Sequence, residues 1–340
     1  MDAEARLDLI TRNTEEIISR EELIARLNEN DKLSAYIGRA TTGPFHIGHL
    51  IAIGKMLDFQ NAGVEAKVLL ADIHAALDDQ KAKWEELSQR AAYTQKCVEL
   101  ALKWKEKPTF VKGSDFQLKS DYVLDALKIA SVSTVERATR AASEVTRMKN
   151  PKVSELIYPI FQALDEQYLD VDIQLGGLDQ RHILVFAREY LPMLGYRKRI
   201  EIMTPLISSL LGPGTKMSSS IPESNIKIYD SVESTRRKID RAYCPEGVAK
   251  DNFILQLTKF LIFTNSPSLK IERENRFGGD VEFKSYGELE GAFVSKRLHP
   301  KDLKTAVADF LIERFKDARS YFEKNTDFLQ RLGKEFLPSS

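Results

Sequence analysis

The chain has 340 residues, of which 43% are hydrophobic and 29% are charged, and its 50 basic and 50 acidic side chains cancel to a formal net charge of zero. This length allows two domains with buried cores, the composition is that of a globular protein, and no run of about 18 apolar residues predicts a membrane span. The neutral balance excludes a global positive field as the means of binding nucleic acid, so any RNA contact must come from local basic clusters.

The two cysteines and the first residues predict a cellular location. Cys97 and Cys244 lie far apart in the sequence, which is typical of reduced thiols in a cytosol. The stretch "MDAEARLDLITRNTEEI" at the start is acidic and has a helical pattern, unlike a cleavable signal or an Arg-rich transit peptide. We therefore expect a cytoplasmic protein that has no membrane partner.

The first 225 residues alternate strand and helix patterns. Ser19 and Glu22 predict a capping box, with a helix from Arg20 to about Asn28. The expected strands are "SAYIGRA" (34–40), "EAKVLLADIHA" (65–75), "PTFVKGSDF" (108–116), "VDIQLGG" (171–177) and "RIEIMTPLI" (199–207). Helical patterns separate them at 46–61, 82–104, 119–152, 154–169 and 179–191. This alternation predicts βαβ units and a doubly wound parallel α/β sheet.

The composition changes after residue 225. Helix-period segments follow at 231–243, 252–263, 285–293 and 300–324, with a short strand signal only around "DVEFKSY" at 280–286. We place a domain boundary near Asn225, with an α/β domain before it and a mostly helical domain after it.

A turn that is rich in glycine and carries two histidines follows the strand expected at 34–40. The stretch "GRATTGPFHIGHLIAIGK" (38–55) leads from this strand into a helix, which is where α/β sheets bind ligands and where helix N-termini face anions. Gly48 lets a ligand approach the backbone, and His46 and His49 are spaced to flank a phosphate. The H-x-G-H pattern alone is a weak signal, and an ordinary structural loop is an equally good interpretation.

A second loop, rich in glycine and serine, follows the last expected strand. The stretch "GPGTKMSSS" (212–220) contains one lysine, Lys216, and alone it is typical of a solvated linker. The two loops occur in this order and flank the α/β region. Together they resemble the HIGH and KMSKS signatures of class I aminoacyl-tRNA synthetases.

The helix expected at 154–169 carries three polar side chains on one face. Tyr158, Gln162 and Asp165 are spaced i, i+4 and i+7, with apolar residues between them. Buried without partners, such groups would each cost about 1–3 kcal/mol. An exposed polar stripe is the alternative, but the apolar surroundings favour a ligand that bears an ammonium and a hydroxyl.

Further stretches extend the resemblance to one family. They are "YIGRATTGPFHIGH", "LLADIHAALDD", "YPIFQALDEQYLDVDIQLGGLDQRH", "KMSSS", "FGGD" and "LHPKDLK". From about residue 8 to 320 the chain resembles the archaeal and eukaryotic branch of tyrosyl-tRNA synthetases. The resemblance implies a Rossmann-like catalytic domain over 1–225 with a helical insertion at about 120–152, and a helical anticodon-binding domain over 226–340.

The resemblance also implies a tyrosine pocket and an ATP site. Tyr36 and Asp165 would hydrogen-bond the phenolic hydroxyl of L-tyrosine, and a pocket that pairs a substrate hydroxyl rejects an analogue without it. The other tyrosine-binding positions, around the α-ammonium or in the wall, would be His74, Tyr158, Gln162 and Gln180. The ATP-binding positions would be Gly38, His46, Gly48, His49, Lys216, Ser218 and Ser219, with His46, His49 and Lys216 as the catalytic ones.

The implied reaction is attack of the tyrosine carboxylate on the α-phosphorus of ATP, which releases pyrophosphate and leaves tyrosyl-adenylate. The tyrosyl group then passes to the 3′ end of tRNA(Tyr). No covalent enzyme intermediate is expected, and catalysis would come from positioning and from donors aimed at the phosphates. Mg²⁺ is expected with the ATP, held mainly by its phosphates, and no tightly held metal site of the protein is expected.

RNA contacts and a homodimer follow from the same resemblance. Arg181 and His182 match positions that read the first base pair of the acceptor stem, and Phe277, His299 and Asp302 match anticodon contacts. An aromatic ring and a histidine are suited to stacking on an unpaired base, although a core aromatic is an equally good interpretation of Phe277. The insertion at 120–152 would form the dimer interface.

The chain departs from the family pattern at two positions. Ser219 stands where the general class I signature has a lysine, so Lys216 would supply all the positive charge of that signature. Ala40 stands where some members of this branch carry an acidic residue, which leaves the role of position 40 open.

Three alternatives compete with this interpretation. A tryptophanyl-tRNA synthetase would not need both Tyr36 and Asp165 aimed at a hydroxyl, and a small-molecule adenylyltransferase would have no use for the helical domain. A non-catalytic RNA-binding relative would have lost catalytic residues, whereas His46, His49 and Lys216 are all present. The tyrosine interpretation is therefore preferred.

Overall fold

The computed structural model describes residues 1–146, 150–215, 217 and 221–339. Two compact units divide the chain. Unit 1 comprises residues Met1–Thr42 and Ala52–Leu206, and unit 2 comprises Gly43–Ile51 and Ile207–Ser340. The boundary expected near Asn225 therefore lies inside unit 2.

Unit 1 is built on one sheet, which has six strands in its described part. They are β1 (Glu16–Ile18), β2 (Ser34–Ala40), β3 (Glu65–Ala71), β4 (Thr109–Lys112), β5 (Ile173–Gly177) and β6 (Ile200–Thr204). The order is β1-β6-β5-β2-β3-β4, with every pair parallel except β1 with β6. The chain winds outward from β2 in both directions, so the predicted doubly wound parallel sheet is confirmed and gains an antiparallel edge strand that the sequence analysis did not include.

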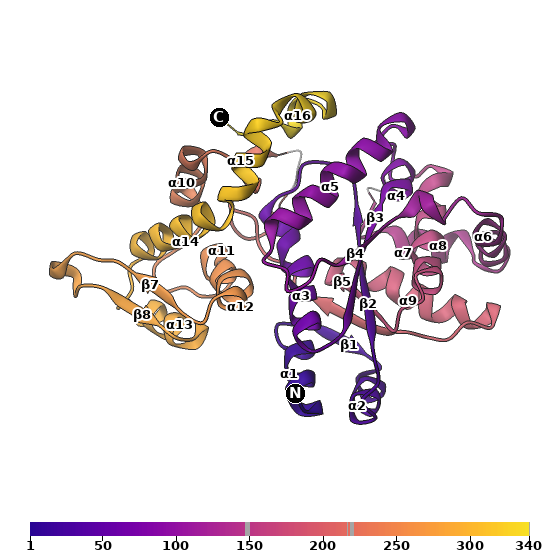
Figure 1. The fold of residues 1–340 in the computed structure, drawn as a ribbon, viewed down its shortest axis with the longest axis horizontal. Coiled ribbons are helices and arrows are strands. Elements are labelled where there is room, and N and C mark those ends of the chain that lie inside the picture. The colour runs from indigo at the N-terminus through magenta and orange to yellow at the C-terminus, as the bar shows by residue number, and fades with distance from the viewer. Residues whose placement is uncertain (147–149, 216, 218–220, 340) are drawn as a thin grey trace. The chain divides into compact units, whose positions relative to one another are not determined.

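Helices cover both sides of this sheet. They are α1 (Ala3–Thr11), α2 (Arg20–Asn28), α3 (Leu50–Asn61, entering from unit 2), α4 (Asp72–Leu77), α5 (Leu87–Ala101), α6 (Ser120–Val132), α7 (Val135–Ala142), α8 (Val153–Tyr168) and α9 (Arg181–Tyr190). Helices α3 and α5 lie on one side, and α7, α8 and α9 on the other (Figure 1). The apolar face of α8, with Ile160 and Leu164, packs in one core with Phe186 of α9. Short 3₁₀ turns complete the unit at Trp84–Glu86, Gly113–Asp115, Leu178–Gln180 and Leu191–Leu194.

Unit 2 is mostly helical, as predicted. Its helices are α10 (Val232–Arg241), α11 (Phe253–Leu257), α12 (Phe263–Asn265), α13 (Tyr286–Val294), α14 (Pro300–Arg314), α15 (Lys316–Lys324) and α16 (Thr326–Leu332), with a π-turn at Thr258–Ile262. Strands β7 (Leu269–Ile271) and β8 (Val281–Phe283) form a small antiparallel pair. Short 3₁₀ turns lie at Ile47–His49, Pro222–Ser224, Asn275–Phe277 and Lys334–Phe336.

Two local predictions are wrong. Ser19 does not cap α2, because its backbone is left-handed (φ 67°) and its hydroxyl instead accepts a hydrogen bond from Arg188 at 2.9 Å. The apolar run expected as one strand over 65–75 ends as a strand at Ala71 and continues as α4. Every residue of α4 is buried, and a fully buried helix shows the same continuous apolar pattern as a buried strand.

Candidate active site

The centre of the unit 1 sheet is the place where an α/β fold binds its ligand. Strands β2 and β5 are parallel neighbours from which the chain winds in opposite directions, and ligands bind at the carboxyl ends of strands at such a switch point. Tyr36 of β2 pairs in register with Gln174 of β5, and both side chains are buried. The residues that the sequence predicts to bind the substrate tyrosine are found around this point.

Asp165 of α8 is the most constrained polar group near this point. Its side chain is 1% exposed, and its Oδ1 accepts hydrogen bonds from Gln117 Nε2 at 2.7 Å and from the Tyr122 hydroxyl at 2.9 Å. Oδ2 is buried and has no hydrogen-bond partner among the described residues. One oxygen of the carboxyl is therefore fixed by protein donors, and the other lacks a donor among the described residues.

His74 of α4 lies opposite that open oxygen. Its Nε2 is 3.7 Å from Asp165 Oδ2 and is likewise buried without a hydrogen-bond partner in the described part of the chain. Burial lowers the pKa of His74 to about 3 and raises the pKa of Asp165 to about 8. Both groups are therefore largely uncharged at neutral pH, and the contact is not an ion pair. A hydroxyl that both donates and accepts would satisfy the two atoms together.

The other residues that are predicted to bind the substrate tyrosine each contact another member of this set. The Tyr36 hydroxyl lies 3.5 Å from the carbonyl of Gln162, and Gln162 Nε2 donates to Gln180 Oε1 at 3.1 Å. The ring of Tyr158 meets that of His74 edge-on, with 4.7 Å between the ring centroids. Burial, followed by the charge of Asp165, raises the pKa of Tyr36 well above its ordinary value, so the phenol stays protonated. The six residues thus form two groups, each of which includes residues of α8: Asp165 with His74 and Tyr158, and Tyr36 with Gln162 and Gln180. Their substrate roles stay predictions.

A second polar layer lies beside this network. Gln174 pairs in register with Glu201 of β6, and Glu201 and Glu166 of α8 are both 0% exposed. All four of their carboxyl oxygens, and Oε1 of Gln174, have no hydrogen-bond partner among the described residues. Burial raises the pKa of Glu201 to about 8 and that of Glu166 well above its ordinary value, so both carboxyls favour the neutral form.

The sequence analysis missed Gln117 and Tyr122, the two donors to Asp165. Gln117 follows the turn at Gly113–Asp115, and Tyr122 lies on the buried face of α6. They lie 48 and 43 positions from Asp165 in the chain. A buried carboxyl requires donors, but no local pattern identifies which residues supply them.

In unit 2, His46 and His49 cap each other across the turn Ile47–His49. His46 Nδ1 accepts from the backbone N–H of Gly48 at 3.2 Å, and His49 Nδ1 accepts from the N–H of His46 at 3.1 Å. The ring centroids are 3.7 Å apart. Because both Nδ1 atoms are acceptors, each neutral imidazole carries its proton on Nε2.

Two glycines of the predicted ATP site have different local constraints. A Cβ on Gly48 would come within 2.8 Å of the end of the Met217 side chain and 3.0 Å of the His46 ring, so a larger residue would have to displace both side chains. A Cβ on Gly38, in unit 1, would meet nothing closer than 3.9 Å, and its backbone is exposed at the end of β2. Packing within the protein therefore does not require Gly38. Lys216, Ser218 and Ser219 lie outside the described residues.

The predicted RNA contacts belong to both units. In unit 1, Arg181 forms a two-pronged ion pair with Glu16, at 2.7 and 3.0 Å, and His182 follows it in the first turn of α9. In unit 2, Asp302 lies in the first turn of α14, and His299 caps that helix by accepting from the N–H of Lys301 at 3.1 Å. The backbone of Phe277 ends the 3₁₀ turn Asn275–Phe277.

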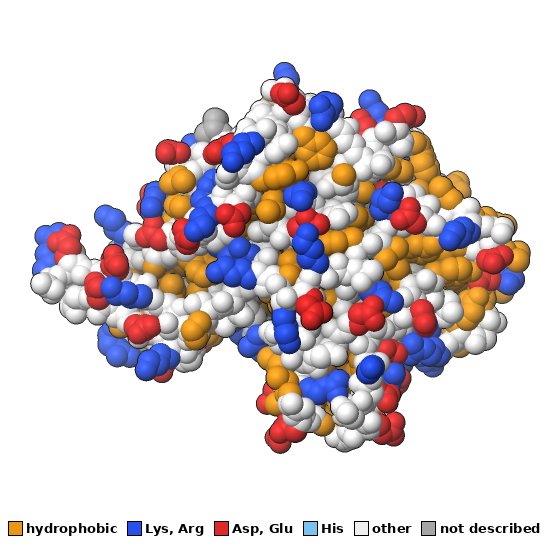
Figure 2. Space-filling view, viewed as in Figure 1, with side chains coloured by type: hydrophobic (Ala, Val, Ile, Leu, Met, Phe, Trp, Pro, Cys, Tyr) orange, Lys and Arg blue, Asp and Glu red, His pale blue; other side chains and the backbone are white. Residues whose placement is uncertain are grey.

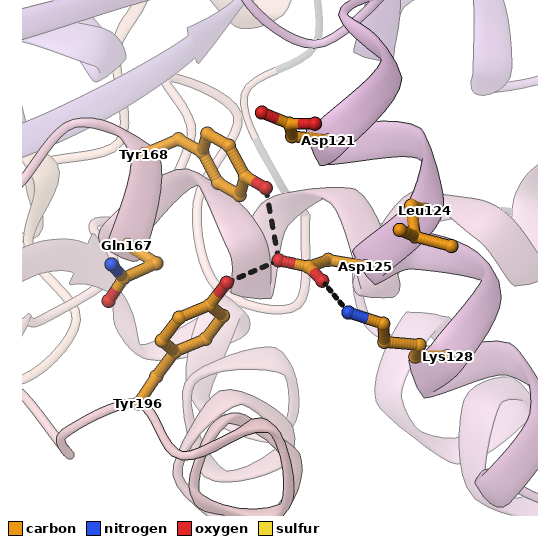
Figure 3. A pocket seen from close by; sticks show the side chains of 7 residues that line it. All are labelled: Asp121, Leu124, Asp125, Lys128, Gln167, Tyr168 and Tyr196. Carbon is orange, nitrogen blue, oxygen red and sulfur yellow. Dashed lines mark hydrogen bonds and ion pairs between the residues drawn. The ribbon is translucent and has the colours of Figure 1, made fainter.

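A separate surface pocket of about 370 Å³ lies between α6 and the end of α8 (Figure 3). Its lining residues are Asp121, Leu124, Asp125, Lys128, Gln167, Tyr168 and Tyr196. Asp125 accepts from Lys128 at 2.8 Å, from Tyr168 at 3.0 Å and from Tyr196. Burial opposes ionisation of Asp125, but these hydrogen bonds lower its pKa below the ordinary value. None of the predicted tyrosine-binding residues lines this pocket.

Comparison with known proteins identifies relatives along almost the whole chain. The family model of class I tRNA synthetases for tryptophan and tyrosine matches residues 28–316. A tyrosine–tRNA ligase of Archaeoglobus fulgidus is 46% identical, covering 94% of this chain and 98% of the relative. A probable cytoplasmic tyrosine–tRNA ligase of Encephalitozoon cuniculi is 41% identical, with 97% and 99% covered. The crystal structure of the Archaeoglobus fulgidus tyrosyl-tRNA synthetase with L-tyrosine superposes with a TM-score of 0.89 at 44% identity, covering 94% of this chain and 99% of that chain.

Proposed function

The chain belongs to the tyrosine–tRNA ligases among the class I tRNA synthetases, and on this premise we propose which of its residues bind tyrosine, ATP and tRNA. The activity is ATP-dependent activation of L-tyrosine and its transfer to tRNA. The tryptophan alternative is not favoured, because the relatives that cover this chain at 41–46% identity are named as tyrosine–tRNA ligases.

Asp165 and Tyr36 bind the phenolic hydroxyl of tyrosine, with His74 in the wall beside it. The observation that carries this proposal is a pair of buried atoms, Asp165 Oδ2 and His74 Nε2, which lie 3.7 Å apart and have no hydrogen-bond partner among the described residues. An analogue without the hydroxyl would leave both atoms unpaired, which is how such pockets discriminate. Gln162 and Gln180, already hydrogen-bonded to each other, surround the α-ammonium together with Tyr158.

ATP is bound through Gly38, Gly48 and the two imidazoles, with Lys216, Ser218 and Ser219 acting on its phosphates. The Nε2–H groups of His46 and His49, fixed by the caps on their Nδ1 atoms, donate to phosphate oxygens. Such preorganised donors stabilise the charge that develops as the carboxylate attacks the α-phosphorus and pyrophosphate leaves. Mg²⁺ enters with ATP and is held mainly by the phosphates.

tRNA(Tyr) is bound by Arg181 and His182 at its acceptor stem and by Phe277, His299 and Asp302 at its anticodon. The ion pair of Arg181 with Glu16 would have to open for Arg181 to reach RNA. We assign a cytoplasmic location on the name of the Encephalitozoon relative. Among the described residues, no helix has the length and apolarity that crossing a membrane requires.

A homodimer is supported by an apolar surface on α6. The helix buries one side and leaves another exposed, with Leu124 52%, Leu127 63% and Val132 54% accessible, and Figure 2 shows apolar side chains at the surface in this region. Contiguous exposed apolar surface marks an association site. The Leu127→Asp variant should therefore elute as a monomer in size-exclusion chromatography with light scattering.

Pyrophosphate exchange with tyrosine, tryptophan and phenylalanine tests the proposed pocket. The wild type should exchange with tyrosine and only weakly with the other two. Asp165→Asn should lose most of the preference for tyrosine over phenylalanine. Exchange supported by tryptophan alone, or an unchanged preference in the variant, would overturn the assignment of the pocket.

A further inference from the structure

Residues 335–339 are hydrogen-bonded to the segment that follows the loop at 212–220. Nζ of Lys227 donates to the carbonyl of Glu335 at 2.6 Å and to that of Leu337. The hydroxyl of Tyr229 donates to the carbonyl of Phe336 at 2.8 Å. We call residues 335–339 the latch and residues 226–230 the post-loop segment. Both belong to unit 2.

A buried ion pair forms the second part of this attachment. Lys238 and Asp230 lie 2.8 Å apart, and both side chains are 0% exposed. The latch completes their hydrogen bonding: the N–H of Ser339 donates to Asp230 Oδ1 at 2.8 Å, and Lys238 donates to the Ser339 hydroxyl at 2.9 Å. Lys227 is also buried, and its backbone N–H donates to the same carboxylate while its Nζ donates to the carbonyls of Glu335 and Leu337. The latch carbonyls therefore supply acceptors that a buried charge needs.

The post-loop segment is in turn bonded to the histidine turn. The backbone N–H of Ile47 donates to the carbonyl of Ile226 at 2.9 Å, and His46 forms an antiparallel bridge with Lys227. The side chains of Ile226 and Ile228 are fully buried, which anchors the segment between these two attachments. Lys227 thus contacts the latch through its side chain and the histidine turn through its backbone.

We propose that residues 335–339 position the His46–His49 turn for ATP by fixing the post-loop segment. This inference rests on the proposed role of His46 and His49 in binding ATP. Lys227, Tyr229 and the latch are positioning groups, because they act through the backbone of the turn and not on the substrate. Loosening the latch leaves the buried Lys227 ammonium without its carbonyl acceptors. The post-loop segment, which contains Lys227, must then shift. The His46 and His49 imidazoles shift with it, because their turn is bonded to that segment.

The test compares Lys227→Met and Tyr229→Phe with Lys250→Met, which changes an exposed lysine of the same unit. Tyr229→Phe removes the hydrogen bond to the carbonyl of Phe336 and keeps the ring, whose centroid lies 4.6 Å from that of the Phe322 ring. We expect Lys227→Met to raise KM for ATP in pyrophosphate exchange by about tenfold, and Tyr229→Phe by about threefold. The dissociation constant for tyrosine should stay within twofold, and Lys250→Met should match the wild type.

Two outcomes would overturn the inference. One is a lower melting temperature with an unchanged KM for ATP at a temperature where the variants are folded, which would make the latch purely structural. The other is an equal loss of tyrosine and ATP binding, which would indicate general damage. His49→Asn separates this inference from the proposed function: if that variant keeps its KM and kcat for ATP, the assignment of the histidines fails, whatever the Lys227 variant does.

Discussion

In the proposed tyrosine pocket of unit 1, Asp165 Oδ2 and His74 Nε2 are buried without hydrogen-bond partners among the described residues. In unit 2, by contrast, the backbone and ring atoms of His46 and His49 cap each other within four residues. The pocket is completed by contacts between distant parts of the chain, such as Gln117 with Asp165. The histidine turn is completed locally. If the proposed roles hold, selectivity for tyrosine depends on buried polar atoms that distant parts of the chain bring together, while phosphate binding depends on donors whose direction is set by the local backbone. Four experiments test this contrast, from the largest expected effect to the smallest.

Asp165→Asn should have the largest effect, because it changes the group on which the pocket depends and keeps its volume. We expect kcat/KM for tyrosine in pyrophosphate exchange to fall about a hundredfold. Asp170→Asn is the matched control, since Asp170 is exposed with φ 46° and asparagine tolerates that conformation. A fall of the same size in the control would mean that the effect is not specific to the pocket.

His49→Asn should reduce kcat of exchange by about tenfold and leave tyrosine binding unchanged. The amide oxygen of asparagine can accept the His46 N–H that His49 Nδ1 accepts now, so the turn keeps its cap and loses only the imidazole. Stopped-flow measurement of adenylate formation, with tyrosine affinity measured separately, checks both parts. If tyrosine affinity falls as much as the rate, the pocket and the turn do not have separate roles.

Glu201→Gln should flatten the pH dependence of stability. Burial raises the pKa of Glu201 from its ordinary value of 4.5 to about 8, so between these values the folded chain holds more protons than the unfolded chain and its stability falls as pH rises. Asp165 acts in the same direction between 3.8 and about 8. His74 acts oppositely, because its pKa of about 3 lies below 6.5, and its contribution is lost as pH falls through that window.

The wild type should therefore melt a few degrees lower at pH 8.5 than at pH 6, and the Glu201→Gln variant should show a smaller drop. Calorimetric scans at the two pH values measure this difference. A larger drop in the variant would show that the buried carboxyl is ionised and stabilising in the fold.

Changes at His299 should give the smallest effect and separate two roles of one residue. His299→Ala removes the cap of α14 and should lower stability by about 1 kcal/mol, whereas His299→Asn keeps a capping oxygen. If the ring stacks on RNA, both variants should raise KM for tRNA by a few-fold and leave pyrophosphate exchange intact. An asparagine variant with wild-type charging kinetics would make His299 a helix cap only.

Much of the fold could be predicted because its signals are local. The helix at Arg20–Asn28 and the strand at Ser34–Ala40 have the predicted bounds. In the segment predicted as a helical insertion, described helices extend from Ser120 to Val132 and from Val135 to Ala142. The edge strand Glu16–Ile18 was missed because three residues give no measurable alternation. Ser19 shows the limit of a local rule, since its hydroxyl bonds to Arg188, 169 positions away.

The sequence by itself determined the family and the doubly wound sheet, because motifs and periodicity depend on neighbouring residues. It also supplied the residues that are proposed to form the tyrosine pocket. Only the tertiary structure decided which donors hold Asp165, which carboxyls are buried without partners among the described residues, and which residues of 335–339 bond to the segment 226–230. These contacts join residues between 43 and 110 positions apart, and burial, which shifts the pKa values and makes an unpaired polar atom costly, exists only once the elements have packed.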